Sequence, residues 1–215
     1  MLGIICKDLY ETFCLKKNMI SMIFIIIFFL FVFFTFKSFY MLLLIVCVSI
    51  PWLGVTALQC SMEQDEICKF DQILLTYPVT RKEIIKSKLI SNFILIGFSN
   101  VLISLPCVLI YIFLYNVCDF KAGMLVWLFG IIISFIITAI NSIGFMLLGN
   151  KKGSIMFIVF ILIYCFVYMS LNWKFDLISW FSSSNVVLLI CTLIAVVMTV
   201  LSYYICLKIY NFKHS

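Results

Sequence analysis

Apolar residues occur along this chain in six long runs, separated by short polar segments. The runs cover residues 19–36, 39–58, 89–115, 124–148, 155–171 and 186–207. A helix rises about 1.5 Å per residue, so roughly 20 mainly apolar residues cross a hydrocarbon layer of about 30 Å. The pattern therefore predicts an all-α integral membrane protein with six transmembrane helices in a single domain. Lys37 and Ser38 alone separate the first two runs, and a tight hairpin is favoured there over one helix of twice the membrane thickness.

The segment before the first run, residues 1–18, has the periodicity of an amphipathic helix. Five apolar side chains share one face: Leu2, Ile5, Cys6, Leu9 and Phe13. Lys7, Glu11 and Asn18 lie on the opposite face. Such a helix is expected to lie in the inner interface of the membrane and to lead into the first span. The alternative is a frayed terminus.

The longest polar segment, residues 59–88, lies between the second and third runs. Ser61 and Gln64 have the spacing of a capping box, and the first turn after Ser61 is acidic. Ile67, Phe70 and Leu74 then share one face. We expect a separate amphipathic helix of about 13 residues here, which ends before Pro78 because the residue preceding a proline disfavours helical geometry.

A second capping box, Thr80 with Glu83, predicts the start of the third spanning helix. Four basic residues follow the threonine: Arg81, Lys82, Lys86 and Lys88. A plain membrane-surface flank would explain these charges, but not the acidic helix before them. Because that helix carries four acids, it is poorly suited to an anionic lipid surface, and a protein partner is favoured.

Composition and charge agree with a membrane protein. Of the 215 residues, 66% are hydrophobic and 11% charged, whereas about a quarter of a typical soluble domain is charged. Twelve of the 15 Lys and Arg residues fall on the side of the N-terminus if each run crosses once. The positive-inside rule then places both termini in the cytoplasm, and the expected location is a bacterial plasma membrane. The net charge of +6 is a topology signal with weak attraction to anionic lipid, and it does not indicate a nucleic-acid partner.

The spans carry little reactive chemistry. Nine of the ten cysteines lie in the apolar runs or on the predicted cytoplasmic side, and none forms a Cys-x-x-Cys pair. The one histidine is His214, so we expect neither a disulfide framework nor a metal site. The most polar mid-span groups are Asn100 and Asn141, which are expected to bond between helices or to line a cavity. Within the fourth run, small residues recur every four positions and predict a face for close helix packing: Gly130, Ser134, Thr138 and Ser142. The segment GNKKGS, residues 149–154, is not a phosphate-binding loop, so the chain is expected to be no enzyme and to hold no cofactor.

The segment EQDEICKFDQILLTYPVTRKEIIKSK resembles permease subunits of the type-2 ABC exporter superfamily. Those proteins carry an acidic helix, a leucine-proline-valine-serine/threonine-arginine turn and a lysine about seven residues later. Pro78, Val79, Arg81 and Lys88 match this pattern, and Tyr77 replaces the usual leucine. The specific match covers about 26 residues, and the six runs match as architecture.

The resemblance implies that the acidic helix is a coupling helix that rests on a separate ATPase subunit, which binds ATP and Mg²⁺. It implies that five residues face the ATPase: Glu63, Glu66, Phe70, Asp71 and Leu75. Arg81 and Lys82 would lie at the joint with the third span, and Lys151 and Lys152 would make a secondary contact. Two permease subunits, identical or paralogous, would pair with two ATPases and alternate between inward-open and outward-open forms.

Hydrophobic or amphipathic cargo is expected, since the spans are uncharged and rich in phenylalanine. Small exporters that this chain is similar to move phenol-soluble modulins or bacteriocins, which favours an amphipathic peptide. One alternative is the substrate-binding subunit of an energy-coupling vitamin importer, but residues 19–36 lack the alanines and glycines that its partner contact uses. A structural membrane assembly protein is another alternative. An intramembrane CAAX-type protease would need glutamates and histidines within the spans.

Overall fold

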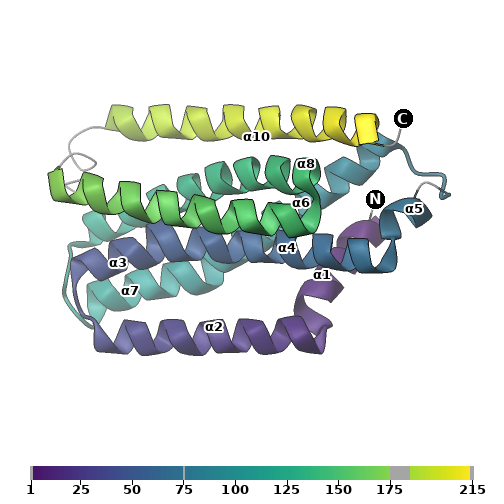
Figure 1. Ribbon diagram of the computed structural model, residues 1–215. Helices are drawn as coiled ribbons and strands as arrows, with labels where there is room; N and C mark the ends of the chain where they lie inside the picture. Colours follow the sequence, from purple (N-terminus) through teal and green to yellow (C-terminus); the bar gives the residue numbers. More distant parts are fainter. Residues whose placement is uncertain (1, 75, 175–184, 214–215) are drawn as a thin grey trace.

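The computed structural model describes residues 2–74, 76–174 and 185–213, and these form an all-helical bundle (Figure 1). The chain begins with α1 (Leu2–Cys14) and α2 (Lys16–Thr35). A nearly continuous helix follows, which we call the second rod and which consists of α3 (Phe39–Leu44), η1 (Ile45–Ser49) and α4 (Ile50–Cys68). After the short α5 (Phe70–Leu74) come α6 (Arg81–Ser99), η2 (Asn100–Ser104) and α7 (Leu105–Phe113). The last elements are α8 (Phe120–Lys174) and α10 (Asn185–Lys213). The first and last described residues lie at the same end of the bundle as α5 (Figure 1).

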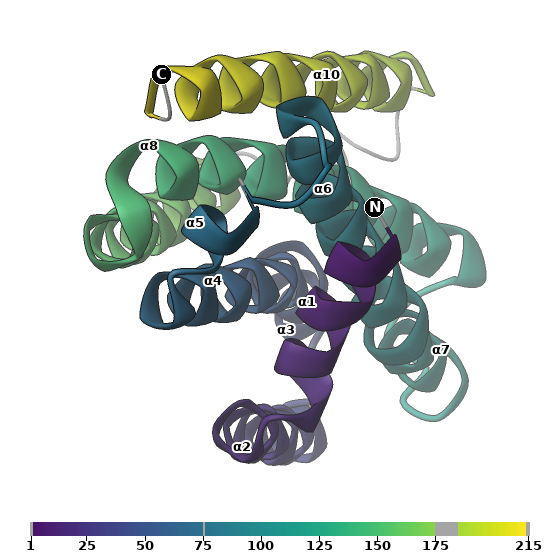
Figure 2. The same ribbon diagram turned by 90° about the vertical axis from the view of Figure 1, so that its right-hand side faces the viewer.

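Among the described residues, four helical stretches are long and apolar enough to cross a membrane. They are Phe39–Cys68, Arg81–Phe113, Phe120–Ser170 and Val186–Lys213. The predicted all-α membrane class is therefore confirmed. The first predicted span corresponds to α2, which stands apart from the bundle beyond α1 (Figure 2).

Two π-helical turns, η1 between α3 and α4 and η2 between α6 and α7, each end just before a proline. The N–H of Ile50 bonds to the carbonyl of Ile45 just before Pro51, and the N–H of Leu105 bonds to Asn100 just before Pro106. Proline has no N–H and its ring clashes with the preceding turn. A wider i−5 turn accommodates both effects inside an otherwise continuous helix. At Pro51 and Pro106 the distortion of the helix therefore takes the form of a π-turn.

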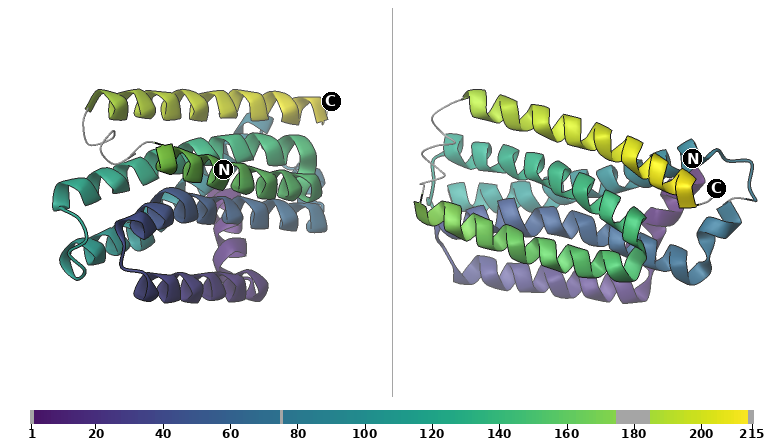
Figure 3. Two further views of the ribbon diagram at one scale, coloured as in Figure 1. Left: turned by 60° about the vertical axis from the view of Figure 1, so that its left-hand side comes forward. Right: turned by 45° about the horizontal axis from the view of Figure 1, so that its top comes forward.

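The helix α8 consists of two antiparallel arms that meet at Gly149 (Figure 3). The ring of Phe145 in the first arm lies 6.2 Å from that of Phe157 in the second, and the chain reverses between them. Gly149 has φ 75° and ψ 178°, a combination that residues with a Cβ rarely adopt. A Cβ there would also lie 3.0 Å from Oε1 of Glu66. The fourth and fifth apolar runs thus correspond to these two arms.

Replacing Gly149 with alanine is expected to destabilise the turn between the arms by about 1–3 kcal/mol, the usual cost of such a conformation for a residue with a Cβ. The apparent thermal midpoint of the purified protein measures this effect. Gly3→Ala is the matched control, because a Cβ at Gly3 meets nothing within 4 Å. An equal midpoint for the two variants would contradict the assignment of Gly149 as the obligatory glycine of this turn.

The small-residue stripe on the first arm of α8 is buried and contacts three different elements. A Cβ at Gly130 would lie 2.6 Å from Cγ1 of Val46 in η1, so close approach there requires glycine. Ser134 accepts a hydrogen bond from the Asn100 amide of η2 at 3.3 Å, and Ser142 lies 3.5 Å from Ser202 of α10. The predicted packing role of the stripe is confirmed.

The amphipathic helix α1 buries the face that carries Asp8 and Thr12, together with Ile4, and leaves much of its predicted apolar face exposed. Ile4, Asp8 and Thr12 are buried against the bundle, whereas Leu2 is 78% exposed and Phe13 38% exposed. The exposed apolar face suits the membrane interface, as the sequence predicts. The polar face is held by partners elsewhere in the chain, which are described below.

The second rod extends further than the sequence indicates, and this corrects one prediction. No helix begins at Ser61: α4 continues without a break from Ile50 to Cys68 and ends at Lys69, which has a left-handed conformation with φ 49°. The capping-box interpretation at Ser61 is wrong because the Ser61 hydroxyl instead donates to Asp8 at 3.0 Å. The acidic segment is therefore the last part of α4, and α5 is a single short turn after it.

Candidate functional site

The candidate site lies at the end of the bundle where α1, the final turns of α4 and the first turns of α6 meet (Figure 2). The helix α6, which corresponds to the predicted third spanning helix, begins at the predicted position. The Thr80 hydroxyl accepts from the N–H of Glu83 and the Glu83 carboxylate accepts from the N–H of Thr80, so the second capping box is confirmed. The cap fixes where α6 starts, and it thereby places Lys88 two turns further on, facing α4.

Asp65 of α4 is the centre of a buried ionic network. One carboxylate oxygen accepts from Lys88 of α6 at 2.5 Å, and the other accepts from Lys7 of α1 at 2.5 Å. The side chains of Asp65 and Lys88 are 1% and 3% exposed. A single carboxylate thus connects α4 to α1 and to α6, through lysines that are 58 and 23 residues away from Asp65 in the sequence.

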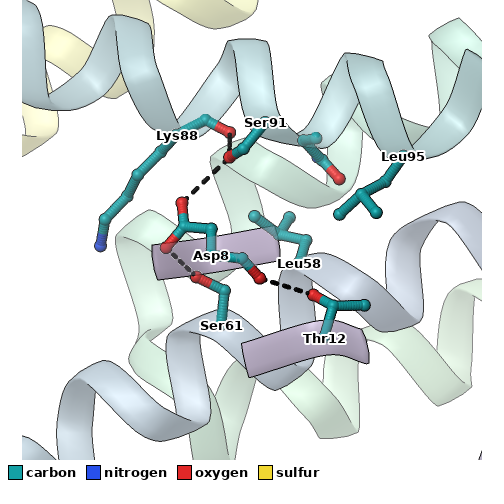
Figure 4. Close-up of a pocket in the computed structure, with 8 residues that line it drawn as sticks. Asp8, Thr12, Leu58, Ser61, Lys88, Ser91 and Leu95 are labelled. Carbon is teal, nitrogen blue, oxygen red and sulfur yellow. Dashed lines mark hydrogen bonds between the residues drawn. The ribbon is translucent and has the colours of Figure 1, made fainter. Parts of the chain in front are cut away.

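A second carboxylate, Asp8, follows Lys7 directly on α1 and makes the same connection (Figure 4). It is 2% exposed and accepts from the Ser61 hydroxyl of α4 and the Ser91 hydroxyl of α6, both at 3.0 Å. Hydrogen bonds to a charged group contribute about 1.5–3 kcal/mol each. Asp8 is therefore a second bridge between the same three helices.

Lys7 lies between the three acids of this cluster. Its ammonium is 2.5 Å from Asp65, 3.1 Å from Glu11 and 3.2 Å from Asp8. Burial alone would lower the pKa of Lys7, but the attraction of these carboxylates outweighs it and raises that pKa. Burial raises the pKa of the Glu11 carboxyl despite the neighbouring ammonium. The three acids are close enough together to hold a cation, and the chain provides one itself in Lys7.

The residues predicted to face a partner lie around this network, and the structure brings several of them together. Glu63 binds Lys17 at 2.7 Å, and the ammonium of Lys7 lies 4.1 Å from the ring centroid of Phe70. Glu66 accepts from the backbone N–H of Asn150 at 2.5 Å. Since Lys151 and Lys152 follow directly and are exposed, the two polar segments at this end of the bundle form one continuous surface.

Arg81 and Lys82 are exposed in the first turn of α6, on the far side of the Pro78 turn from α5. Leu75 lies outside the described residues, as does the side chain of Asp71. Both in-span asparagines are buried: Asn100 bonds to Ser134 and to the carbonyl of Ile96, and Asn141 bonds to the carbonyl of Ile137.

Sequence reasoning missed the residues at the centre of the site. Lys88 belongs to the resemblance motif, yet the pattern places it in a membrane-surface flank, whereas the structure buries it against Asp65. Asp8 has no sequence signal beyond its place in an amphipathic helix. Each of these residues depends on a partner far away in the sequence.

The fold and this site define a multi-pass helical membrane protein. At one end of its bundle Asp65, Lys88, Lys7 and Asp8 link α1, α4 and α6, and we call this group the charged joint. Residues 3–211 match the family described as ABC-2 family transporter protein, and the chain belongs to that family. Family members are the membrane component of a transporter, are not themselves catalytic and normally work with an ATPase subunit. No curated protein matches the chain, and no solved structure does.

Proposed function

We propose that the chain is the permease subunit of an ATP-driven exporter, and that its charged joint receives the movement of a separate ATPase subunit. The observation that carries this proposal is the buried Asp65–Lys88 pair, which links the acidic end of α4 to the start of α6. A rigid link of this kind passes a displacement of α4 and α5 directly to α6. ATP and Mg²⁺ bind to the partner and not to this chain.

The surface that meets the ATPase is formed by the end of α4 together with α5 and the turn after it. Glu63, Glu66, Phe70, Asp71 and Leu75 make the contact, with Arg81 and Lys82 at the joint and Lys151 and Lys152 as a secondary contact. Phe70 is half-buried, so part of its side chain remains accessible to a partner. Aromatic residues, phenylalanine among them, are enriched at protein interfaces.

The membrane arrangement has six spans: α2, the two proline-containing rods, the two arms of α8, and α10. An even number of crossings agrees with chain ends on the same side, and the distribution of basic residues places that side in the cytoplasm. Two such subunits, identical or paralogous, pair with two ATPases in a bacterial plasma membrane. The cargo is hydrophobic or amphipathic, and an amphipathic peptide suits the uncharged spans.

The test uses the chain co-expressed with a candidate ABC ATPase subunit and purified in lipid. Phe70→Ala and Arg81→Ala are each expected to weaken ATPase association at least tenfold and to abolish stimulation of ATP turnover by an amphipathic helical peptide. Phe120→Ala and Lys121→Ala are the controls, because both residues are exposed at the start of α8, at the other end of the predicted spans. Unchanged association and stimulation in the first pair would show that this surface does not couple the two subunits.

A further inference from the structure

A groove of about 260 Å³ lies between α2 and the helices of the bundle. Met19, Ile23 and Ile26 of α2 form one wall, and Leu53 of α4 and Phe98 of α6 form part of the other. The three residues of α2 remain 42–48% exposed, so the groove is open to its surroundings. The helix α2 stands apart from α4 (Figure 2), and side chains of both helices line the space between them. In the proposed arrangement of spans, this space lies within the membrane.

The lining of the groove offers a ligand almost no polar contacts. Its two hydroxyl groups already have partners within the chain: Thr56 donates to the carbonyl of Leu53 at 2.7 Å, and Ser99 donates to the carbonyl of Ile96 at 2.9 Å. The other lining residues are apolar. A polar molecule in the groove would give up its hydrogen bonds to water and gain little in return. The lining therefore favours a hydrocarbon chain.

The size of the groove fits such a chain. An apolar cavity of about 150 Å³ is large enough to bind benzene, so the larger groove has room for on the order of ten carbon atoms. From Met19 to Ile26 the wall extends about 10 Å along α2, at about 1.5 Å per residue. A helix of that length with its side chains is about 10 Å across and would occupy several times the volume of the groove. An acyl chain therefore fits better than a helix of a peptide or of a second copy of this chain.

A lysine stands at the head of the α2 wall. Lys16 precedes Met19, Ile23 and Ile26 at the spacing i, i+3, i+7 and i+10, so all four residues lie on one face of the helix. Lys16 is exposed and forms no ion pair within the described part of the chain, whereas the neighbouring Lys17 binds Glu63 at 2.7 Å. An ammonium group above an apolar groove is complementary to an anionic headgroup that carries an acyl chain.

We propose that the groove binds an acyl chain of an anionic phospholipid, whose headgroup lies at Lys16. In the proposed topology Lys16 is on the cytoplasmic side, so the lipid belongs to the inner leaflet. Its acyl chain fills the space between α2 and α4 and thereby connects α2 to the bundle. The inference rests on the proposed arrangement of spans. It does not depend on the proposed contact with an ATPase, because none of the lining residues belongs to the charged joint.

The test measures which phospholipid the purified chain retains. The chain is reconstituted in bilayers of equal parts phosphatidylglycerol and phosphatidylcholine with identical acyl chains, extracted in mild detergent and weighed by native mass spectrometry. One phosphatidylglycerol molecule is expected to be retained about fivefold more often than one phosphatidylcholine molecule, the effect of a single lysine on an anionic lipid. Lys16→Gln is expected to abolish this preference. Lys213→Gln, which removes another exposed lysine at the same end of the bundle, is expected to preserve it (Figure 1).

A pair of variants in α2 tests whether the acyl chain lies in the groove. Ile26→Trp fills the groove and is expected to reduce the retention of both phospholipids at least fivefold. Ile27→Trp adds the same indole to the next residue, which is 59% exposed and does not line the groove, and is expected to leave retention unchanged. Because both residues are largely exposed, neither variant disturbs the buried core, and the difference between them reports on the groove alone.

Two results would overturn the proposal. Equal retention of the two phospholipids by the unaltered chain, together with equal retention by Ile26→Trp and Ile27→Trp, would mean that only unspecific boundary lipid is bound. Retention of an added amphipathic helical peptide in place of lipid, lost in Ile26→Trp, would assign the groove to cargo. Because the experiment contains no ATPase, failure of this site and failure of the proposed coupling are separate results.

Discussion

Replacing Asp65 with leucine is expected to lower the apparent thermal midpoint of the purified protein by on the order of 10 °C. The substitution removes the carboxylate that binds both Lys7 and Lys88, and the Lys88 side chain is only 3% exposed. Removing one partner of a buried ion pair typically costs about 3–5 kcal/mol, because the charge left behind stays desolvated. For chains of 150–250 residues each kcal/mol corresponds to about 2–4 °C.

A matched control lies two residues earlier in the same helix. Glu63 also pairs with a lysine, but in that pair the side chains of Lys17 and Glu63 are 70% and 31% exposed. An exposed pair contributes about 0–1 kcal/mol, so Glu63→Leu is expected to shift the midpoint by only a few degrees. Similar shifts for Asp65→Leu and Glu63→Leu would contradict the assignment of Asp65 as the buried centre of the network.

A double substitution separates the charge from the packing. Adding Lys88→Met to Asp65→Leu removes the second charge of the pair and restores an apolar contact between α4 and α6. Replacing both partners of a buried ion pair by apolar residues is often neutral or stabilising. The double variant is therefore expected to recover much of the lost stability, as measured by the same thermal midpoint.

The long apolar runs could be predicted from the sequence because membrane thickness alone dictates their length. The π-turns could be anticipated only as distortions near Pro51 and Pro106, since the local hydrogen-bond pattern depends on how the neighbouring helices pack. The start of α6 was predictable in detail, because both partners of its cap, Thr80 and Glu83, lie within one turn.

The acidic segment could not be placed from the sequence for the opposite reason. A serine followed by acids has the pattern of a helix start, and the same pattern fits the interior of a helix whose acids find basic partners elsewhere. Here Glu63 pairs with Lys17, Asp65 pairs with Lys88, and Glu66 accepts from the backbone N–H of Asn150. The helix α4 therefore continues through Ser61. Periodicity identified the polar face of α1 correctly, but it contained no information on Ser61 and Ser91, which are 53 and 83 residues away from Asp8.

The helix α1 is expected to detach from the bundle when Asp8 is replaced by leucine. Asp8 accepts from Ser61 and Ser91, one on each neighbouring helix, and both bonds are lost. At about 1.5–3 kcal/mol for each bond to the carboxylate, local opening of α1 becomes easier by about 3 kcal/mol or more. Hydrogen exchange of the α1 amides measures such opening directly, and their rates are expected to rise on the order of 100-fold.

Two further variants decide whether α1 is held by the protein or by lipid. Tyr10→Leu alters an exposed residue of the same helix, 61% exposed, and is expected to leave the exchange rates unchanged. Replacing both Ser61 and Ser91 with alanine is expected to reproduce the effect of Asp8→Leu, because it leaves the Asp8 carboxylate buried without these two donors. If Asp8→Leu exchanges no faster than Tyr10→Leu, the exposed apolar face of α1 holds the helix in place through the membrane alone. In that case α1 would lie beside the charged joint without being part of it.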